Sequence, residues 1–529
     1  VLADSHVDGV LVVLSPQAMT DPAGAAAAVI KVAKSTSKPI LTSWMGGKKV
    51  HEGITRLNNA GIPTYDTPEQ AVRAFMYLVT YARNHQFLYE TPRAMPVQYS
   101  LDRPHLRELV ETALQEGRDI LSEHTSKSLL EAYGIPVNPT AIARSAEEAV
   151  QLSHQMGVPV VLKVFSEQIT HKTDVGGVEL GLHDDDEITA AYNRIIQRVQ
   201  AARPEAEVEG VTVQRMVSEP KGHELILGVK RDPVFGMVLL VGAGGTTAEL
   251  YQDRSLELPP LNERLARHAL EMLRIWPLLN GYRGHPAVNL DQLIEVLIRL
   301  SYFVADLPEI VELDINPLLV TPDYVIALDA RIVVNRTLSD SSSRSYSHLA
   351  IRPYPEEFTK TARLKDGTLV RLRPIQPEDE EKWHELLRGC SPESIRARFR
   401  FTFQGTTHDM ATRFCFIDYD REIAIVAERA EEPAGQLIGV GRMVADADHR
   451  EAEYAVLVGD RWQGQGLGSA LTDYCLDVCR SWGVNRIVAE TAPDNYRMLE
   501  LFRKRGFVKQ HASSTDTILL MKKLEADTA

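Results

Sequence analysis

The sequence predicts a multidomain α/β protein with about three domains. The chain has 529 residues, and one domain usually takes about 100–200 residues. Short apolar runs alternate with helical patterns up to about residue 335 and again after residue 360, as expected for sheets covered by helices. Two polar stretches, 84–103 and 338–355, interrupt this alternation and are interpreted as linkers.

The composition is that of an ordinary globular protein. Hydrophobic residues make up 44% and charged residues 25% of the chain, which excludes disordered, collagen-like and disulfide-scaffold classes. The formal net charge is −14, which argues against nucleic-acid and membrane partners. No apolar run reaches the ~20 residues of a membrane helix. Four cysteines form no disulfide framework, so a cytoplasmic location is expected.

The N-terminal stretch predicts a parallel sheet. The run VDGVLVVLS is apolar almost throughout, as in a strand buried on both faces, and Asp21 and Pro22 then favour a helix start. Strand and helix patterns go on alternating, so this part is interpreted as half of a doubly wound domain. Because the chain begins with Val1 in place of Met, we expect a fragment whose natural N-terminus is missing. The predicted elements are 7–15, 21–33, 39–47, 50–60, 62–65 and 68–83.

A glycine-rich turn carries the strongest functional signal. The strand 452–458 is followed by QGQGLG and then by a helix. A helix N-terminus presents free backbone N–H groups and a positive dipole end, which together bind pyrophosphate. Glycines suit this role because a Cβ would hold the phosphates away. A dinucleotide-binding fold is disfavoured, since the turn comes late in the domain and the strand before it contains a Glu. A plain strand–turn–helix connection is the other alternative.

The order of elements around this turn resembles the GNAT acetyltransferase superfamily. The turn QGQGLG, a helix, the strand RIVAET and the segment APDNYRMLELFRKRGF follow one another as in that family. The resemblance implies an acyltransferase domain, of mixed α/β fold, that binds acetyl-CoA. The pyrophosphate would lie on Gln463, Gly464, Gln465, Gly466, Leu467, Gly468 and Ser469, the pantetheine arm on Val456, Leu457 and Val458, and the cofactor would also contact Asn495.

Lysine acetylation needs a general base, because a lysine of pKa ~10.4 is almost entirely protonated at neutral pH. Glu453 is the first candidate, since it shares one face of an apolar strand with Ala455 and Leu457. A carboxylate in apolar surroundings titrates closer to neutral pH, which suits a base. Glu490 on the next strand is the second candidate, and the two strands would splay around the acyl group. The alternative is that each is a solvated residue at a strand end.

Two other features near this turn leave alternatives open. Phe502 stands where GNAT enzymes often carry a tyrosine general acid, so the thiolate would leave unassisted or take its proton from water or Tyr496. The cluster of Arg396, Arg398 and Arg400 is interpreted either as a solvated face or as a guide for an acidic partner protein.

The middle of the chain predicts a phosphate site. The apolar strand 158–164 contains Lys163, and a buried ammonium without an anion is costly, so a phosphate would suit it. Further along, Glu312, Asp314 and Asn316 lie two apart, so a strand directs all three to one face. The next strand brings Asp329 beside them, and such oxygen ligands suit Mg²⁺. The alternative is the polar face of a two-stranded sheet.

The segments LSEHTSKSLLEAYGIP and LKVFSEQITHKTDVGGV resemble the ATP-grasp domain of NDP-forming acyl-CoA synthetases, relatives of succinyl-CoA synthetase. Residues 1–90 resemble the CoA-ligase domain joined to it. The resemblance implies binding of ATP or ADP with Mg²⁺. Lys163 would contact the phosphates, Gln214, Met216 and Val217 the adenine, Glu224 the ribose and His171 a relayed phosphate, with Asn316 and Asp329 at the metal.

The domain order resembles bacterial Pat-type protein lysine acetyltransferases. This implies acetylation of lysines on metabolic enzymes such as acyl-CoA synthetases, with the ligase-like region as a regulatory module; a homo-oligomer is compatible with it. The rivals are an active NDP-forming acetate–CoA ligase and a non-catalytic acyl-CoA sensor. Ligase turnover is not expected, because the family's main phosphorylated histidine lies upstream of this chain. The predicted parts are a partial CoA-ligase-like domain (1–95), a linker and helix (96–118), an ATP-grasp domain (119–337), a linker (338–360) and a GNAT domain (361–526).

Overall fold

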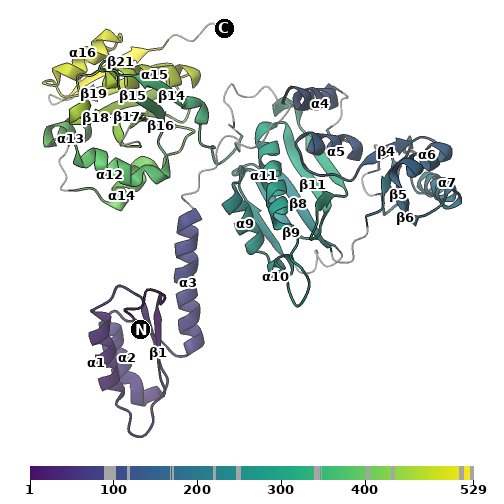
Figure 1. The fold of residues 1–529 in the computed structure, drawn as a ribbon, viewed down its shortest axis with the longest axis horizontal. Helices are drawn as coiled ribbons and strands as arrows, with labels where there is room; N and C mark the ends of the chain where they lie inside the picture. Colours follow the sequence, from purple (N-terminus) through teal and green to yellow (C-terminus); the bar gives the residue numbers. More distant parts are fainter. Residues whose placement is uncertain are drawn as a thin grey trace. The chain divides into compact units, whose positions relative to one another are not determined.

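In the computed structural model the chain forms two units, Val1–Glu90 and Thr91–Ala529, which are treated separately below (Figure 1). Within the described residues, no helix is long and apolar enough to cross a membrane. The structure describes residues 1–87, 103–115, 119–166, 168–169, 172–217, 222–245, 252–338, 346, 348–400, 405–430, 435–510 and 517–524.

The first unit contains the predicted parallel sheet. Its three strands lie in the order β1–β2–β3, and both strand pairs are parallel. Asp21 caps α1 by accepting from the N–H groups of Ala23 and Gly24, as its position before Pro22 predicts. The elements are β1 (Val10–Leu14), α1 (Pro22–Ala33), β2 (Ile40–Trp44), α2 (His51–Asn59), β3 (Thr64–Tyr65) and α3 (Pro68–Phe87).

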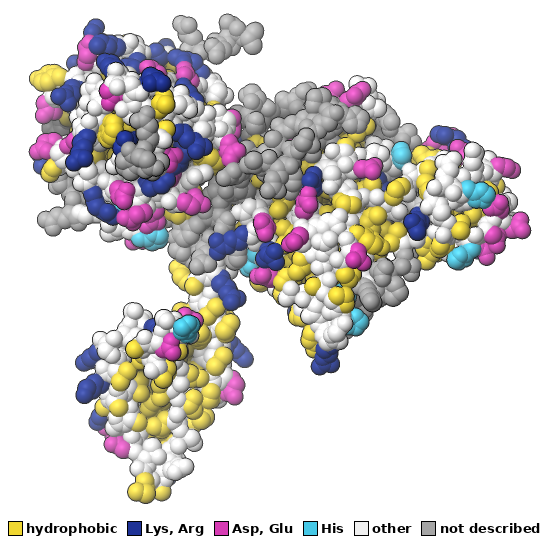
Figure 2. Space-filling model, viewed as in Figure 1, with side chains coloured by type: hydrophobic (Ala, Val, Ile, Leu, Met, Phe, Trp, Pro, Cys, Tyr) yellow, Lys and Arg dark blue, Asp and Glu magenta, His cyan; other side chains and the backbone are white. Residues whose placement is uncertain are grey.

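Helix α3 exposes apolar side chains. Tyr77 and Tyr81 are each 69% exposed, and Val72, Met76 and Leu78 are close to half exposed. Figure 2 shows apolar side chains on the visible surface of this unit. The predicted linker 84–103 begins inside α3, and most of it falls outside the described residues.

The second unit begins with a small antiparallel sheet in the order β4–β7–β5–β6. Helices α6 and α7 pack on it around Ile188, Ile195 and Val199, all fully buried. The elements are α4 (Arg103–Gln115), α5 (Glu123–Ala132), β4 (Thr140–Ala143), α6 (Ala146–Met156), β5 (Val160–Phe165), β6 (Val178–Leu182), α7 (Asp185–Ala202) and β7 (Gly210–Arg215).

A larger sheet follows in the order β10–β9–β8–β11–β12, with β13 also paired to β11. Helix α11 lies across this sheet in Figure 1, and most of its residues are buried in the same core as the strands. The elements are β8 (His223–Asp232), β9 (Gly236–Ala243), β10 (Arg254–Glu257), α9 (Glu263–Glu271), α10 (Trp276–Leu279), α11 (Leu290–Asp306), β11 (Ile310–Val320), β12 (Val325–Ala327) and β13 (Ala330–Val334).

The C-terminal part contains an eight-stranded sheet in the order β14–β15–β16–β17–β18–β19–β21–β20. Helices α12 to α14 cover one face and α15 and α16 the other, each over its own core. The elements are β14 (Lys360–Arg363), β15 (Leu369–Pro374), α12 (Glu380–Arg388), α13 (Pro392–Phe399), α14 (His408–Cys415), β16 (Glu422–Arg429), β17 (Leu437–Ala445), β18 (Glu451–Val458), α15 (Leu467–Ser481), β19 (Arg486–Thr491), α16 (Tyr496–Lys504), β20 (Val508–Lys509) and β21 (Ile518–Lys523).

Strands β18 and β19 form a parallel pair that ends early. The pairing covers Glu451, Ala452 and Glu453 on β18, the last opposite Val488. Beyond Glu453 the two strands no longer pair, whereas β18 stays paired to β17 as far as Val458. The predicted splay of these two strands is therefore present, and it leaves one backbone edge of β18 open along residues 455–458.

Candidate functional site

The glycine-rich turn after β18 has the geometry of an anion site. Gly464 and Gly466 have φ angles of 80° and 93°, a region that strongly favours glycine. Among the described residues, the backbone N–H groups of 464–469 donate to no hydrogen-bond acceptor, and the first bonded N–H is that of Ala470. They form the N-terminus of the 15-residue helix α15, where a negative group is stabilised.

Side chains around the turn hold it in shape. The Gln463 amide donates to the carbonyl of Val458 at 3.2 Å and to Ser394 at 3.1 Å, which ties the turn to the end of β18. The N–H of Lys365 donates to the Gln465 carbonyl at 3.2 Å. The Lys365 side chain passes Gly466, since a Cβ built there would lie 3.5 Å from its Cε. A cation therefore lies beside the free N–H groups.

Asn495 is the predicted cofactor contact that lies outside the glycine-rich turn and strand β18. It is the N-cap of α16, and its Oδ1 accepts from the N–H of Met498 at 3.2 Å. The Asn495 oxygen is therefore already used within the protein. Tyr496, which follows it, is 76% exposed.

Glu453 lies on the predicted strand face but not in apolar surroundings. Ala452 and Tyr454 point into the core under α15, so Glu453 points to the opposite face with Ala455 and Leu457. The Glu453 side chain is exposed and borders a cavity with several arginines. The expectation of an apolar environment is therefore wrong, because Glu453 lies near the start of β18, where arginines of α13, α14 and β17 line the cavity.

Glu490, the second candidate base, already has a partner. Its carboxylate forms an ion pair with Arg400 at 3.1 Å, and both side chains are partly exposed. The two candidates therefore differ: Glu453 borders a cavity, and Glu490 forms a surface ion pair.

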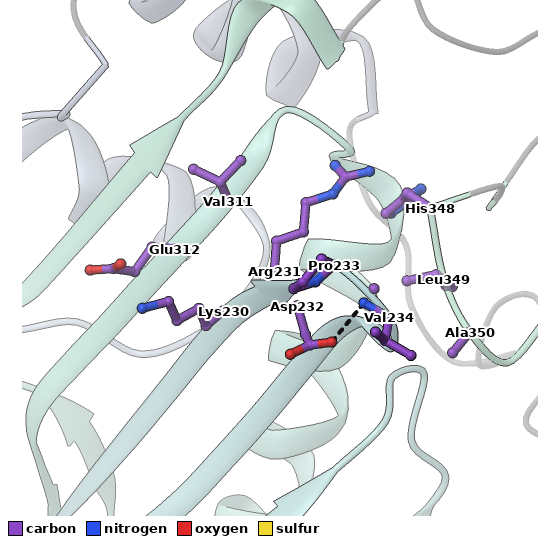
Figure 3. Close-up of a pocket in the computed structure, with 11 residues that line it drawn as sticks. Lys230, Arg231, Asp232, Pro233, Val234, Val311, Glu312, His348, Leu349 and Ala350 are labelled. Carbon is purple, nitrogen blue, oxygen red and sulfur yellow. Dashed lines mark hydrogen bonds between the residues drawn. The ribbon is translucent and has the colours of Figure 1, made fainter.

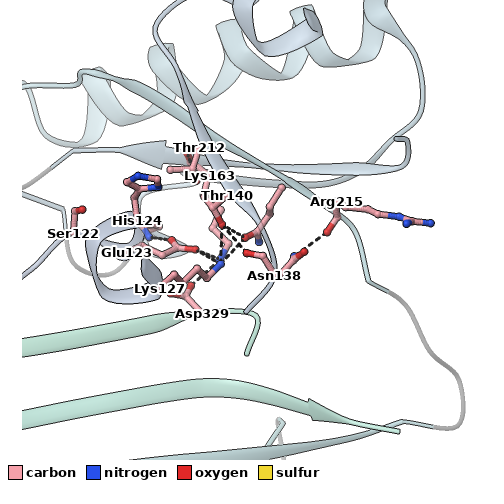
Figure 4. Close-up of polar contacts among 12 residues, drawn as sticks. Ser122, Glu123, His124, Lys127, Asn138, Thr140, Lys163, Thr212, Arg215 and Asp329 are labelled. Carbon is pink, nitrogen blue, oxygen red and sulfur yellow. Dashed lines mark hydrogen bonds and ion pairs between the residues drawn. The ribbon is translucent and has the colours of Figure 1, made fainter. Parts of the chain in front are cut away.

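A second charged cluster lies between α5, β5 and the turn before β13 (Figure 4). The buried carboxylate of Glu123 pairs with Lys163 and Lys127, each at 3.1 Å, and with Lys172. Lys163 also reaches Asp329 at 2.8 Å. The anion that the sequence required for Lys163 is thus supplied by two carboxylates of the chain itself.

The three lysines decide the charge of Glu123. Burial would raise the pKa of Glu123, but the charges of Lys163, Lys172 and Lys127 outweigh it and hold this pKa below its usual range. Burial lowers the pKa of Lys127, and Glu123 opposes that effect. For Lys163, Glu123 and Asp329 outweigh burial and raise the pKa. Three cations around two carboxylates leave an excess positive charge, which suits phosphate.

The predicted metal ligands lie next to each other. The N–H of Asn316 donates to the backbone carbonyl of Asp329 at 3.3 Å. Glu312 and Asp314, which share the polar face of β11, face Arg331 at 3.3 and 3.9 Å. In the described part of the chain, no group of three or more His, Cys, Asp or Glu side chains is placed to hold a metal ion. A divalent cation here would need phosphate oxygens in addition to Asn316 and Asp329.

The remaining predicted nucleotide contacts lie along β7 and β8. Gln214 is buried and accepts from Lys127 at 3.0 Å, and Met216 and Val217 follow it at the end of the strand. Glu224 is exposed on β8. His171 falls outside the described residues.

A cavity of about 620 Å³ lies at the C-terminal end of β8, at the turn into β9 and away from Glu224. Lys230 and Arg231 border it, together with Glu312 and with His348 from the segment after β13 (Figure 3). Of the predicted metal-site candidates on β11, Glu312 lines it, and Asp314 and Asn316 do not. Its acidic groups are already engaged: Glu312 pairs with Arg331, and Asp232 accepts from the N–H groups of the turn.

The sequence analysis did not predict which side chains lie beside Lys163 and beside Glu453. Glu123 and Lys127 lie four apart on α5, a spacing that joins them on one helix face, but nothing local links them to Lys163. The arginines beside Glu453 come from α13, α14 and β17. Arg398, interpreted with Arg396 and Arg400 as one cluster, points into that cavity, whereas Arg400 pairs with Glu490.

Comparison with known proteins identifies the family of the region that holds the cluster around Lys163. Residues 112–334 match the ATP-grasp domain family. The chain is 38% identical over 228 residues to the acetate–CoA ligase [ADP-forming] I subunit beta of Pyrococcus furiosus, covering 43% of this chain and 97% of that protein. The chain belongs to the ADP-forming acetate–CoA ligase family. It is also 35% identical over 332 residues to acetate–CoA ligase [ADP-forming] I of Archaeoglobus fulgidus, which covers 63% of this chain and 46% of that protein. The chain thus spans about half the length of this single-chain ligase.

The C-terminal part matches a second family. Residues 381–507 match the acetyltransferase (GNAT) family, and the chain is 29% identical over 154 residues to the acetyltransferase PA5475 of Pseudomonas aeruginosa, which covers 29% of this chain and 83% of that protein. The protein therefore joins an acyl-CoA synthetase-like ATP-grasp region to a C-terminal GNAT domain. The predicted α/β multidomain fold class is confirmed.

Proposed function

We propose that this protein is a Pat-type protein lysine N-acetyltransferase whose ligase-like region regulates the GNAT domain. The observation that carries the proposal is the run of free N–H groups at 464–469, which follows the strand that holds Glu453. The match of this part to the acetyltransferase family supports an acyltransferase.

Acetyl-CoA would bind along one path. Its pyrophosphate would accept hydrogen bonds from the N–H groups of 464–469, with the Lys365 ammonium nearby. The pantetheine arm would extend a sheet edge, since residues Val456 to Val458 have an open edge where β19 departs. The thioester would then lie near the last paired residue, Glu453.

In the reaction, the Glu453 carboxylate takes a proton from the substrate ammonium, directly or through a water molecule. The neutral amine attacks the thioester carbon and forms the amide C–N bond as the C–S bond breaks. The electron pair of that bond leaves on the coenzyme sulfur, which takes up the proton that the acylated nitrogen gives up, directly or through water. Open N–H groups of β18 would stabilise the oxyanion.

The ligase-like region would sense a nucleotide. The excess positive charge around Lys163 and Lys172 suits its phosphates, and Asn316 and Asp329 would share Mg²⁺ with phosphate oxygens. Regulation requires that a nucleotide bind two states of the protein with different affinity. Nucleotide-dependent acetyl-transfer rates would measure that difference.

The test is transfer from labelled acetyl-CoA to purified acyl-CoA synthetases. Wild type should label a lysine of at least one of them, and Glu453→Gln should lose the activity. Glu490→Gln is the matched control, since it removes a carboxylate from the neighbouring strand. Loss of transfer in Glu490→Gln with retention in Glu453→Gln would refute the assignment of the base.

A second candidate is ADP-forming acetate–CoA ligase activity, because the match to such ligases covers the cluster around Lys163. Release of ADP that depends on ATP, CoA and acetate together would establish it. Release that persists in Lys163→Gln would show that another site is responsible.

A further inference from the structure

A cavity of about 350 Å³ opens beside Glu453 on the sheet face covered by α12 to α14. This size lies within the range of small-ligand sites. Because Glu453 is the proposed base, the amine of the acceptor must reach this cavity. The lining residues are Arg398, Arg413, Phe414, Glu422, Arg442, Val444, Glu453 and Ala455.

Arg398 is the unusual member of this cavity. Its guanidinium forms no hydrogen bond or ion pair with any residue that the structure describes, and it contacts the ring of its neighbour Phe399. Burial, together with the charge of Arg442, lowers the pKa of Arg398 to about 10 against the attraction of Glu453. Arg398 is partly buried and forms no ion pair with the described residues, so a carboxylate of a bound molecule would be stabilised beside it.

The other charges of the cavity do not supply that anion. Arg442 pairs with Glu422 at 3.1 Å and donates to the carbonyl of Phe414 at 2.6 Å. Glu453 remains, but in the proposed reaction its carboxylate engages the ammonium of the acceptor. Arg398 and the exposed Arg413 then form no ion pair with a carboxylate of the residues that the structure describes.

We propose that Arg398 and Arg413 bind a carboxylate of the acceptor, so that the enzyme prefers lysines with an Asp or Glu within two residues. This rests on the proposed lysine acetyltransferase function and names its substrate class. A guanidinium binds a carboxylate through two parallel N–H donors, which gives direction as well as charge. A lysine with a neighbouring acid would thus place its ammonium at Glu453 and its carboxylate at the two arginines.

The experiment compares matched peptides with the full chain. Each peptide has one lysine and a single Glu at position −2, −1, +1 or +2, and its partner has Gln there. We expect kcat/KM for at least one Glu peptide to exceed that of its Gln partner by about tenfold, a charge-assisted hydrogen bond being stronger than a neutral one. Equal rates for all four pairs would overturn the proposal.

Variants assign the preference to the arginines. Arg398→Gln and Arg413→Gln should each reduce the Glu-over-Gln ratio toward one, and Arg398→Lys should retain part of it. Arg396→Gln is the matched control, since Arg396 is exposed on the same helix and does not border the cavity. A ratio that survives in both Gln variants would refute the arginine assignment.

Two readouts keep this proposal separate from the proposed function. Gln peptides report basal transfer, and their rate should change little in the control Arg396→Gln. If no peptide or protein accepts acetyl in a Glu453-dependent manner, the proposed function fails. If transfer occurs but Glu and Gln peptides react at the same rate, only the proposed preference for lysines with a neighbouring acid is refuted. Unchanged acetyl-CoA affinity, measured by calorimetry, would show that each variant is folded.

Discussion

Glu453 lies opposite Val488 in the last paired position between β18 and β19. Beyond this position the strands separate, so the carboxylate stands at the branch point where a thioester would enter between them. The exposed Glu490 lies farther along β19 and pairs with Arg400. The two candidate bases of the sequence thus occupy different environments.

The length of the Glu453 side chain should matter. Glu453→Asp withdraws the carboxylate by one methylene, and displacement of a reacting group by about 1 Å can cost on the order of 100-fold in rate. We expect kcat to fall by about 10- to 100-fold, with little change in the KM for acetyl-CoA. Glu451→Asp, on the same strand and paired with Arg486, should be nearly neutral. Equal losses in both variants would contradict a catalytic role.

Gly466→Ala should weaken acetyl-CoA binding. The φ of Gly466 is 93°, and a residue with a Cβ is disfavoured there by about 1 to 2 kcal/mol. Relief of this strain would turn the free N–H groups away from the phosphates. Gly389→Ala is the control, since Gly389 follows α12 outside the turn and its Cβ would meet the Glu385 carbonyl at an ordinary 3.5 Å. Calorimetric titration with acetyl-CoA should show a higher Kd for the first variant and a similar Kd for the second.

Glu123→Gln should destabilise the ATP-grasp region. Removing the carboxylate leaves Lys127, Lys163 and Lys172 facing one another, and breaking a buried pair costs about 3–5 kcal/mol. Urea unfolding should show this loss at pH 7. Glu312→Gln, which breaks a partly exposed pair with Arg331, should change the unfolding free energy by less than about 1 kcal/mol.

This loss should depend on pH in one direction. The folded pKa of Glu123 is depressed, so its contribution is fully present above the unfolded value of about 4.3. The contribution declines as the pH falls below that value toward the folded pKa. The difference between wild type and Glu123→Gln should therefore stay constant from pH 7 to pH 5 and shrink below pH 4. A difference that shrinks already near pH 6 would contradict the depressed pKa.

Lys163→Gln should abolish nucleotide binding. The substitution removes a cation that both Glu123 and Asp329 position. A ligand at 100 times its Kd stabilises a protein by about 2.7 kcal/mol, so ATP with Mg²⁺ should raise the Tm of wild type but not that of the variant. Lys230→Gln, at the far end of β8, should keep the full shift. An unchanged shift in Lys163→Gln would exclude this cluster as the nucleotide site.

Local patterns in the sequence were sufficient to predict many helices and strands. They also predicted the glycine turn of the candidate acetyl-CoA site. Apolar runs predicted the parallel strands of the first unit, and Asp21 before Pro22 predicted the start of α1. The glycine turn was predicted with its residues, because a free helix N-terminus and left-handed glycines depend on neighbours in the chain. The need of Lys163 for an anion was also evident from its apolar strand.

Only the tertiary structure decided which groups meet. Glu123 and Lys163 lie 40 positions apart, and Arg398 and Glu453 come from a helix and a strand that the sheet brings together. The point at which β18 and β19 part, and with it the exposure of Glu453, depends on strand register. The physical reason is that burial and charge pairing arise from contacts between distant segments, whereas periodicity and capping act within a few residues.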